Sequence, residues 1–126
     1  MSVLVDSSAW INYFRNVGDA DTIDMLIEQD LIVINDLILA EIIPTLQIRK
    51  ENLLISLLRE VKRQPLAIEW DHIIWMQVVC LKNGVHGVGI SDLIIAQNAI
   101  HGTHRLLSND KHFLLMAKHL PLEMYR

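Results

Sequence analysis

The sequence has little of what would place it outside the cell or in a membrane. Its 126 residues include one cysteine, Cys80, so no internal disulfide can form. Charged or polar residues interrupt every apolar stretch before it reaches the roughly 20 residues of a membrane-spanning helix. Residues 1–6 lack the basic region of a signal peptide, and the sixth is already an acid, Asp6. We therefore expect a cytoplasmic protein with no membrane segment.

Proline and glycine are also scarce, at three and five residues, while 52% of the chain is hydrophobic. This composition argues against disorder and predicts a sizeable core. The length suits one domain covering residues 1–126. No glycine-rich phosphate loop, Walker motif, GxSxG or CxxC occurs, so nothing points to the sites that these motifs build.

The charge balance is acidic, with 15 acidic and 11 basic residues and a net charge of −4. An acidic chain binds nucleic acid poorly without local basic clusters. Two such clusters occur, at residues 49–50 and at Arg59, Lys62 and Arg63. Clusters of this kind are usually a solvated surface, and the alternative is a patch that steers RNA or binds a partner.

Short apolar runs alternate with helical patterns along the chain. We expect strands at 3–6, 31–34, 66–68, 105–107 and 122–124. Helices are expected at 9–14, 21–28, 36–41, 51–63, 73–82, 92–100 and 111–118. Pro44 should kink or restart the third helix, and Ser7 or Ser8, Asp36, Asp71 and Ser91 are the expected caps. The alternation predicts an α/β fold with a parallel sheet.

Four acidic residues occur where an acid is hardest to explain structurally. Asp6 ends an apolar run, Glu41 and Asp92 lie inside apolar segments, and Asp110 closes residues 106–110. A carboxylate rarely enters such surroundings unpaired. Asp6 and Asp110 follow strands, and right-handed connections would bring the helices of Glu41 and Asp92 to the same edge. We therefore expect the four carboxylates to converge.

Converging carboxylates repel one another, and a divalent cation is the simplest way to hold them. Oxygen ligands without cysteine suit Mg²⁺ or Mn²⁺, which can activate a water for phosphodiester hydrolysis. Ser7 and Ser108 adjoin these acids and could hydrogen-bond a carboxylate or a bound water. Taken alone, Asp92 could instead be a first-turn acid and Asp110 a helix cap. Glu41, expected to be buried mid-helix, is harder to explain structurally.

The histidines give weaker signals. His101 and His104 flank Gly102-Thr103, and a loop pair of this kind is more often ordinary surface than a metal site. His86 lies in a loop from which it could approach a substrate, whereas His112 and His119 have the placement of helix-face residues. The helix at 73–82 is apolar nearly all round, so we expect it to pack deeply or against a second copy.

In three segments around the acids, the chain resembles the PIN-domain family, and within it the VapC-type toxins of prokaryotic toxin–antitoxin pairs. These are VLVDSSAWI at 3–11, GISDLIIA at 89–96 and LLSNDKHF at 106–113. Glu41 in LAEI at 39–42 matches the family's second acid, and either Ser7 or Ser8 fills the position of its small hydroxyl residue. Ser108 replaces a common threonine, and Pro44 is less usual at its position.

The resemblance implies a parallel β-sheet flanked by helices on both faces. It implies an Mg²⁺- or Mn²⁺-dependent ribonuclease with Asp6, Glu41, Asp92 and Asp110 as its catalytic and metal-binding residues. It further implies homodimers, an RNA substrate and a cognate VapB-type antitoxin that inserts a segment near the site.

Three hypotheses follow from these observations: a toxin endoribonuclease, a non-toxin PIN nuclease of RNA processing, and a binding module whose acids hold a structural ion or the antitoxin. A phosphatase that forms an aspartyl-phosphate requires a DxD motif after the first strand. Here Asp6 is followed by two serines, so this class is less well supported.

Overall fold

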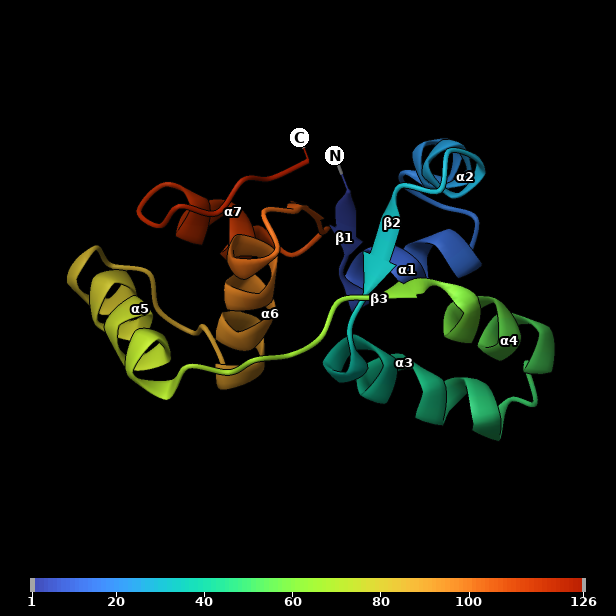
Figure 1. The fold of residues 1–126 in the computed structure, drawn as a ribbon, viewed down its shortest axis with the longest axis horizontal. Helices are drawn as coiled ribbons and strands as arrows, with labels where there is room; N and C mark the ends of the chain where they lie inside the picture. Colours follow the sequence, from blue (N-terminus) through green and yellow to red (C-terminus); the bar gives the residue numbers. More distant parts are fainter. Residues whose placement is uncertain (1, 126) are drawn as a thin grey trace.

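The computed structural model describes residues 2–125, which fold around a sheet of four parallel strands (Figure 1). The strand order is β3-β2-β1-β4. β1 (Val3–Val5) pairs with β2 (Ile32–Ile34) on one side and with β4 (Arg105–Leu107) on the other. β1 is therefore central, and all three of its side chains are fully buried.

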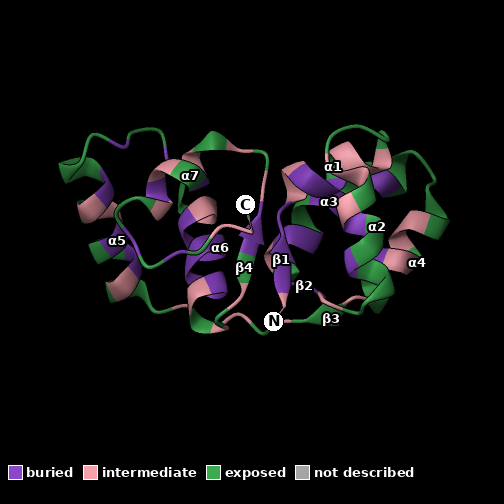
Figure 2. Ribbon diagram, turned by 90° about the horizontal axis from the view of Figure 1, so that it is seen from above, coloured by how far each residue is buried: buried purple, intermediate pink, exposed green. Residues whose placement is uncertain are grey.

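Helices cover the sheet on both sides. In Figures 1 and 2, α5 (Trp70–Lys82), α6 (Ile90–His101) and α7 (Lys111–Ala117) lie to the left of the strands. To the right lie α1 (Ser7–Phe14), α2 (Ala20–Glu28), α3 (Asp36–Ile48) and α4 (Asn52–Glu60). The predicted α/β fold, with a parallel sheet between helices, is confirmed. None of the helices among residues 2–125 is long and apolar enough to cross a membrane.

The core lies between the strands and the helices next to them. α6 is its most deeply buried helix, because every residue from Leu93 to Ala99 is buried, including the polar Gln97 and Asn98 (purple in Figure 2). Both polar side chains are hydrogen-bonded, as buried polar groups must be. α6 therefore anchors its N-terminal acid, Asp92, to the rigid centre of the molecule.

One strand of the sheet does not lie where the sequence predicts it. The expected helix at 51–63 ends at Glu60, and β3 (Lys62–Arg63) then pairs in parallel with β2. The expected edge strand at 66–68 is wrong, because these residues form no strand. Two exposed basic residues make a poor strand pattern but suit a sheet edge, since pairing uses only the backbone. At 122–124 the expected strand is reduced to one bridge, between Leu106 and Met124.

Helix starts also differ from expectation. Asn35, not Asp36, caps α3, because its fully buried side chain accepts the Ile38 N–H at 2.8 Å. α6 begins at Ile90 after Gly89, before the expected cap Ser91. α5 begins at Trp70 rather than after Asp71, and α1 directly follows Asp6. α3 continues through Pro44 without restarting.

α5 has two different apolar faces. Ile73, Met76 and Cys80 are buried, and the helix packs against α6. The opposite face exposes large apolar side chains, namely Trp70, Ile74, Trp75, Val78 and Leu81. The helix is thus buried on one side only, and a partner for the exposed side stays a prediction.

Candidate metal centre

Asp6 is the buried centre of the site. It follows β1 at the N-cap position of α1 and is 4% exposed. Its Oδ2 accepts hydrogen bonds from Ser8 Oγ at 2.9 Å and Ser108 Oγ at 2.8 Å, and Ser7 Oγ lies 3.4 Å from Oδ1. Three hydroxyl groups therefore replace much of the water that this carboxylate loses on burial.

The three serines also link Asp6 to the rest of the site. Ser7 donates to Glu41 Oε1 at 3.2 Å, so one hydroxyl lies between two carboxylates. Ser108 Oγ lies 3.2 Å from Ser8 Oγ and accepts the Asp110 N–H at 3.0 Å. Both candidates for the hydroxyl after the first acid thus contact Asp6. The sequence left open whether Ser7 or Ser8 takes this position, and the structure brings both hydroxyl groups to Asp6.

Glu41 reaches the site from the second turn of α3, where it is exposed. The expectation of a buried Glu41 is wrong. Its neighbours Ile42 and Ile43 face the core, and the helical turn directs Glu41 away from it. The pKa of Glu41 is raised, first by partial loss of water and then by repulsion from Asp6 and Asp92, while the Ser7 hydrogen bond opposes the rise.

Asp92 enters from the first turn of α6 and is half-buried. The pKa of Asp92 is raised, first by burial and then by repulsion from Asp110 and Asp6. The Gly89 N–H, 3.4 Å from Oδ2, opposes the rise, and so does His112. Because Asp6 and Asp92 both act on Glu41, and Asp6 and Asp110 both act on Asp92, the four acids form one electrostatic cluster.

Asp110 has two roles in the structure. It caps α7, since its Oδ1 accepts the His112 N–H at 2.9 Å, which is the helix-cap role that the sequence allowed for it. It also lies in the cluster, because ligand atoms of Asp92, Asp110 and His112 are all within 4.8 Å of one another. His112 Nδ1 is 3.0 Å from Asp110 Oδ1, so this histidine belongs to the site rather than to an ordinary helix face. Its spacing two residues after a capping acid was the signal that could have identified it.

The donor set fits a divalent cation. Carboxylate oxygens dominate it and one imidazole joins at the edge. The pKa values of Glu41 and Asp92 are raised, first by burial and then by repulsion from neighbouring acids. Asp6, Glu41, Asp92 and Asp110 would hold the ion, and Ser7, Ser8 and Ser108 would orient their oxygens.

A groove of ≈ 290 Å³ leads away from Glu41 between α1, α3 and the start of α4. Apolar side chains such as Ile11 and Leu46 line it, and so do Arg15 and Arg49. Of the predicted basic clusters only Arg49 reaches this groove, whereas Arg63 bonds Asp36 on the surface at 2.7 Å.

His101 and His104, whose spacing gave only a weak metal signal, do not share a site. His104 bonds Gln64 at 2.8 Å, and His101 lies instead beside Glu69. His86 is exposed in the loop that precedes α6.

Comparison with known proteins agrees with this geometry. The family profile described as PIN domain matches residues 3–119, and the chain belongs to this family. The fold is similar to a VapBC2 structure from Rickettsia felis, bound to a DNA fragment from its promoter, with a TM-score of 0.77, 16% identity and coverage of 98% of this chain and 97% of that one.

Two further solved structures have the same fold. DNA-bound VapBC from Salmonella typhimurium matches with a TM-score of 0.76, 13% identity and coverage of 98% and 96%. FitAcB from Neisseria gonorrhoeae matches with a TM-score of 0.72, 16% identity and coverage of 98% and 96%. A search of curated protein sequences finds no match.

Proposed function

We propose that residues 1–126 form one PIN domain that acts as an Mg²⁺- or Mn²⁺-dependent endoribonuclease, the toxin of a VapBC-type pair in the cytoplasm. The observation that carries the proposal is the convergence of Asp6, Glu41, Asp92 and Asp110 at the carboxyl edge of the sheet. Family membership and the three toxin–antitoxin structures of similar fold support it.

The residues of the site have distinct tasks in this proposal. Asp6 is a fixed anchor, because its hydroxyl partners leave its carboxylate little freedom to rotate. Glu41 is exposed and tied only through Ser7, so it can adjust to a bound phosphate. The bound cation would supply the chemistry of phosphodiester hydrolysis by lowering the pKa of a coordinated water. His112 holds Asp110 at a set distance from Asp92.

The surroundings of the site suggest its partners. RNA is the proposed substrate, and Arg15 and Arg49 provide positive charge beside the acids. The apolar side chains that line the groove suit a segment of a VapB-type antitoxin, which would block the site by occupying it. The exposed apolar face of α5 is the proposed contact of a homodimer.

The test is cleavage of RNA by the purified chain in Mg²⁺ and in EDTA. We expect cleavage in Mg²⁺ alone, and its loss in Asp6→Asn. Asp21→Asn, which removes an exposed acid of α2, is the matched control and should cleave normally. Cleavage that survives both EDTA and Asp6→Asn would overturn the proposal. Mapping the RNA ends after brief expression in cells would identify the target.

A further inference from the structure

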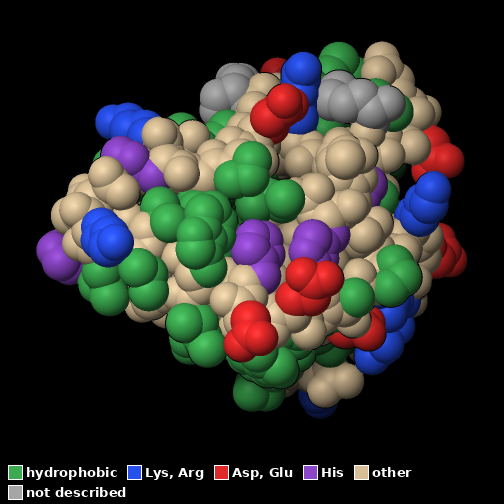
Figure 3. Space-filling view, turned by 60° about the vertical axis from the view of Figure 1, so that its left-hand side comes forward, with side chains coloured by type: hydrophobic (Ala, Val, Ile, Leu, Met, Phe, Trp, Pro, Cys, Tyr) green, Lys and Arg blue, Asp and Glu red, His purple; other side chains and the backbone are tan. Residues whose placement is uncertain are grey.

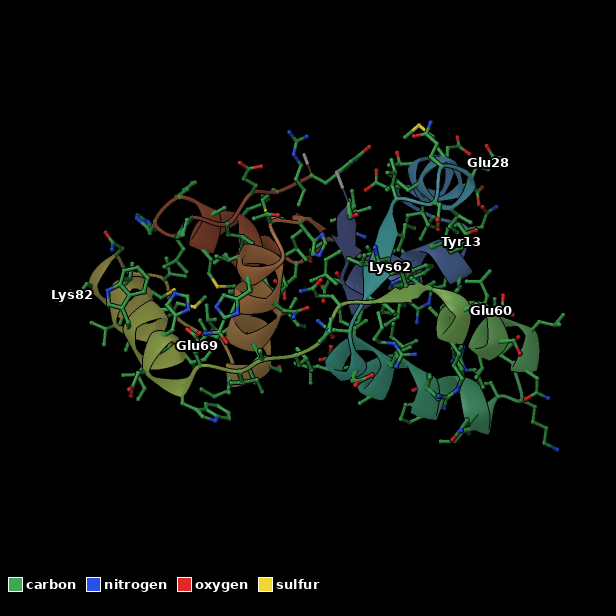
Figure 4. The ribbon with its side chains drawn as sticks, viewed as in Figure 1. Tyr13, Glu28, Glu60, Lys62, Glu69 and Lys82 are labelled. Carbon is green, nitrogen blue, oxygen red and sulfur yellow. The ribbon has the colours of Figure 1, made fainter. Side chains whose placement is uncertain are left out.

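A second group of metal-binding side chains lies between α5 and α6. Glu69 immediately precedes α5, His72 lies in its first turn, and His101 is the last residue of α6. Their ligand atoms are all within 4.8 Å of one another. Figure 4 places Glu69 at the start of α5, beside α6, and Figure 3 shows histidine and acidic side chains adjoining on this face. Three possible donors thus lie together where α5 begins and α6 ends.

The two imidazoles lie next to each other. His72 and His101 stack with their ring centroids 5.8 Å apart and their planes 19° apart. His101 Nε2 is 3.8 Å from Glu69 Oε2, too long for a hydrogen bond. Trp75 stacks on the other side of His72, at 5.6 Å. The rings are therefore held by packing, and their contact with the carboxylate is loose enough to admit an ion.

Buried Gln97 makes a hydrogen bond to His72. Its Oε1 accepts the Glu69 N–H at 3.1 Å and its Nε2 donates to the Glu69 carbonyl at 3.1 Å, so the orientation of its amide is determined. The same Nε2 lies 2.9 Å from His72 Nδ1, which must be the acceptor. The lone pair of His72 Nδ1 is thus engaged by the Gln97 N–H, and an ion that binds His72 at this nitrogen replaces that hydrogen bond.

This cluster is separate from the candidate metal centre. Asp92 lies in the first turn of α6 and His101 at its end. Nine residues of helix at about 1.5 Å each separate them by about 14 Å.

We propose that Glu69, His72 and His101 bind one transition-metal ion of the Zn²⁺ class, which clamps the start of α5 to the end of α6. Two imidazoles with one carboxylate suit Zn²⁺, Co²⁺ or Ni²⁺, whereas Mg²⁺ prefers oxygen. The ion binds His72 Nδ1 in place of the Gln97 N–H, so the Gln97 amide moves away from this nitrogen when the site is filled. Glu69 and His101 are exposed, so the ion can enter and water can complete its coordination.

The test is calorimetric titration of the chelator-stripped full chain with Zn²⁺. We expect a site, distinct from the acidic centre, whose affinity falls at least about tenfold in His72→Gln and in His101→Gln. His119→Gln, which removes an exposed histidine beyond α7, and Asp6→Asn should both retain this site. In wild type, Zn²⁺ at about 100-fold over its Kd should raise the unfolding midpoint by about 10 °C.

Histidine NMR of the wild-type protein gives a readout that does not depend on how a variant folds. One equivalent of Zn²⁺ should move the ring signals of His72 and His101 and leave those of His119 in place. The proposal is overturned if both histidine variants bind Zn²⁺ as wild type does, if Asp6→Asn abolishes the binding, or if the two ring signals stay unchanged. None of these results depends on RNA cleavage, so the Zn²⁺ site can be disproved without disproving the proposed nuclease activity.

Discussion

Replacing Asp92 by asparagine should stabilise the metal-free protein while weakening its response to Mg²⁺. Asp92 is half-buried and faces Asp110, and its pKa is raised by burial and by repulsion from Asp110 and Asp6. An amide of the same shape removes one charge from this cluster. The change therefore relieves repulsion in the folded state without opening a cavity.

The size of the effect follows from the distance between the two acids. Ligand atoms of Asp92 and Asp110 lie within 4.8 Å, where two charges repel by about 3.5 kcal/mol at an effective dielectric constant of about 20. The Asp110 side chain is 34% exposed and His112 lies 3.0 Å from it, so solvent and this imidazole screen part of the repulsion. We expect a net gain of about 1 kcal/mol, or about 4 °C in the unfolding midpoint.

Saturating Mg²⁺ should reverse the order of the two proteins. At about 100-fold over the Kd, binding stabilises the folded state by about 2.7 kcal/mol. Wild type should gain this amount. Asp92→Asn should gain much less, because it lacks the carboxylate that would coordinate the ion. The assay is thermal unfolding of both proteins in EDTA and in Mg²⁺. Asp21→Asn, which changes the net charge equally on an exposed surface, should follow wild type in both buffers.

The reasoning is refuted if Asp92→Asn unfolds at or below the wild-type temperature in EDTA, because the acids would then not repel one another appreciably. It is also refuted if Mg²⁺ stabilises both proteins equally, because Asp92 would then not contact the ion.

Three further predictions concern titration, orientation and the buried polar network. The raised pKa values of Glu41 and Asp92 mean that the folded state binds their protons more tightly than the unfolded chain does. The urea midpoint of the metal-free protein should therefore fall as pH rises above the ordinary values of 4.5 and 3.8. Ser108→Ala removes a hydroxyl that bonds two members of the acidic cluster and should weaken Mn²⁺ binding about 10- to 100-fold by calorimetry, whereas Ser108→Thr should not. Asn98→Ala leaves the buried Asn35 amide without its partner at 2.9 Å and should cost about 1–3 kcal/mol in urea unfolding.

Each of these has a contrary outcome. A urea midpoint that rises across the same pH interval would mean that the acids are stabilised rather than strained by folding. Equal Mn²⁺ affinity in the alanine and threonine variants of Ser108 would remove its orienting role. Unchanged stability of Asn98→Ala would show that water replaces the missing amide.

The acids could be found in the sequence because their surroundings are local. Asp6 follows an apolar run, and Asp92 interrupts one of the most apolar stretches in the chain, so each is anomalous within a few neighbours. Glu41 was found for the wrong reason, since its apolar neighbours predict burial and the structure exposes it. A helix turns exposed and buried positions into alternate faces, so Ala40 and Glu41 point outward beside buried Leu39 and Ile42, and the run of apolar residues does not reveal this.

Contacts between distant segments could not be predicted in the same way. Ser8 and Ser108 are 100 residues apart, and their hydroxyl groups are 3.2 Å apart because β1 and β4 are neighbours. β3 was missed because its two basic residues carry no strand pattern and are paired by the backbone of β2. The spacing of His101 and His104 suggested a pair, whereas the packing of α5 on α6 gave His101 a different partner, His72.

The sequence by itself determined the α/β class, the parallel sheet and the four acids, because alternating apolar runs and misplaced charges are properties of neighbouring residues. Only the tertiary structure decided which side chains share a site. It brought Ser8 and His112 to the acids and joined Glu69, His72 and His101. The physical reason is that strand order and helix packing set distances between segments, and those distances are recorded in no single stretch of the chain.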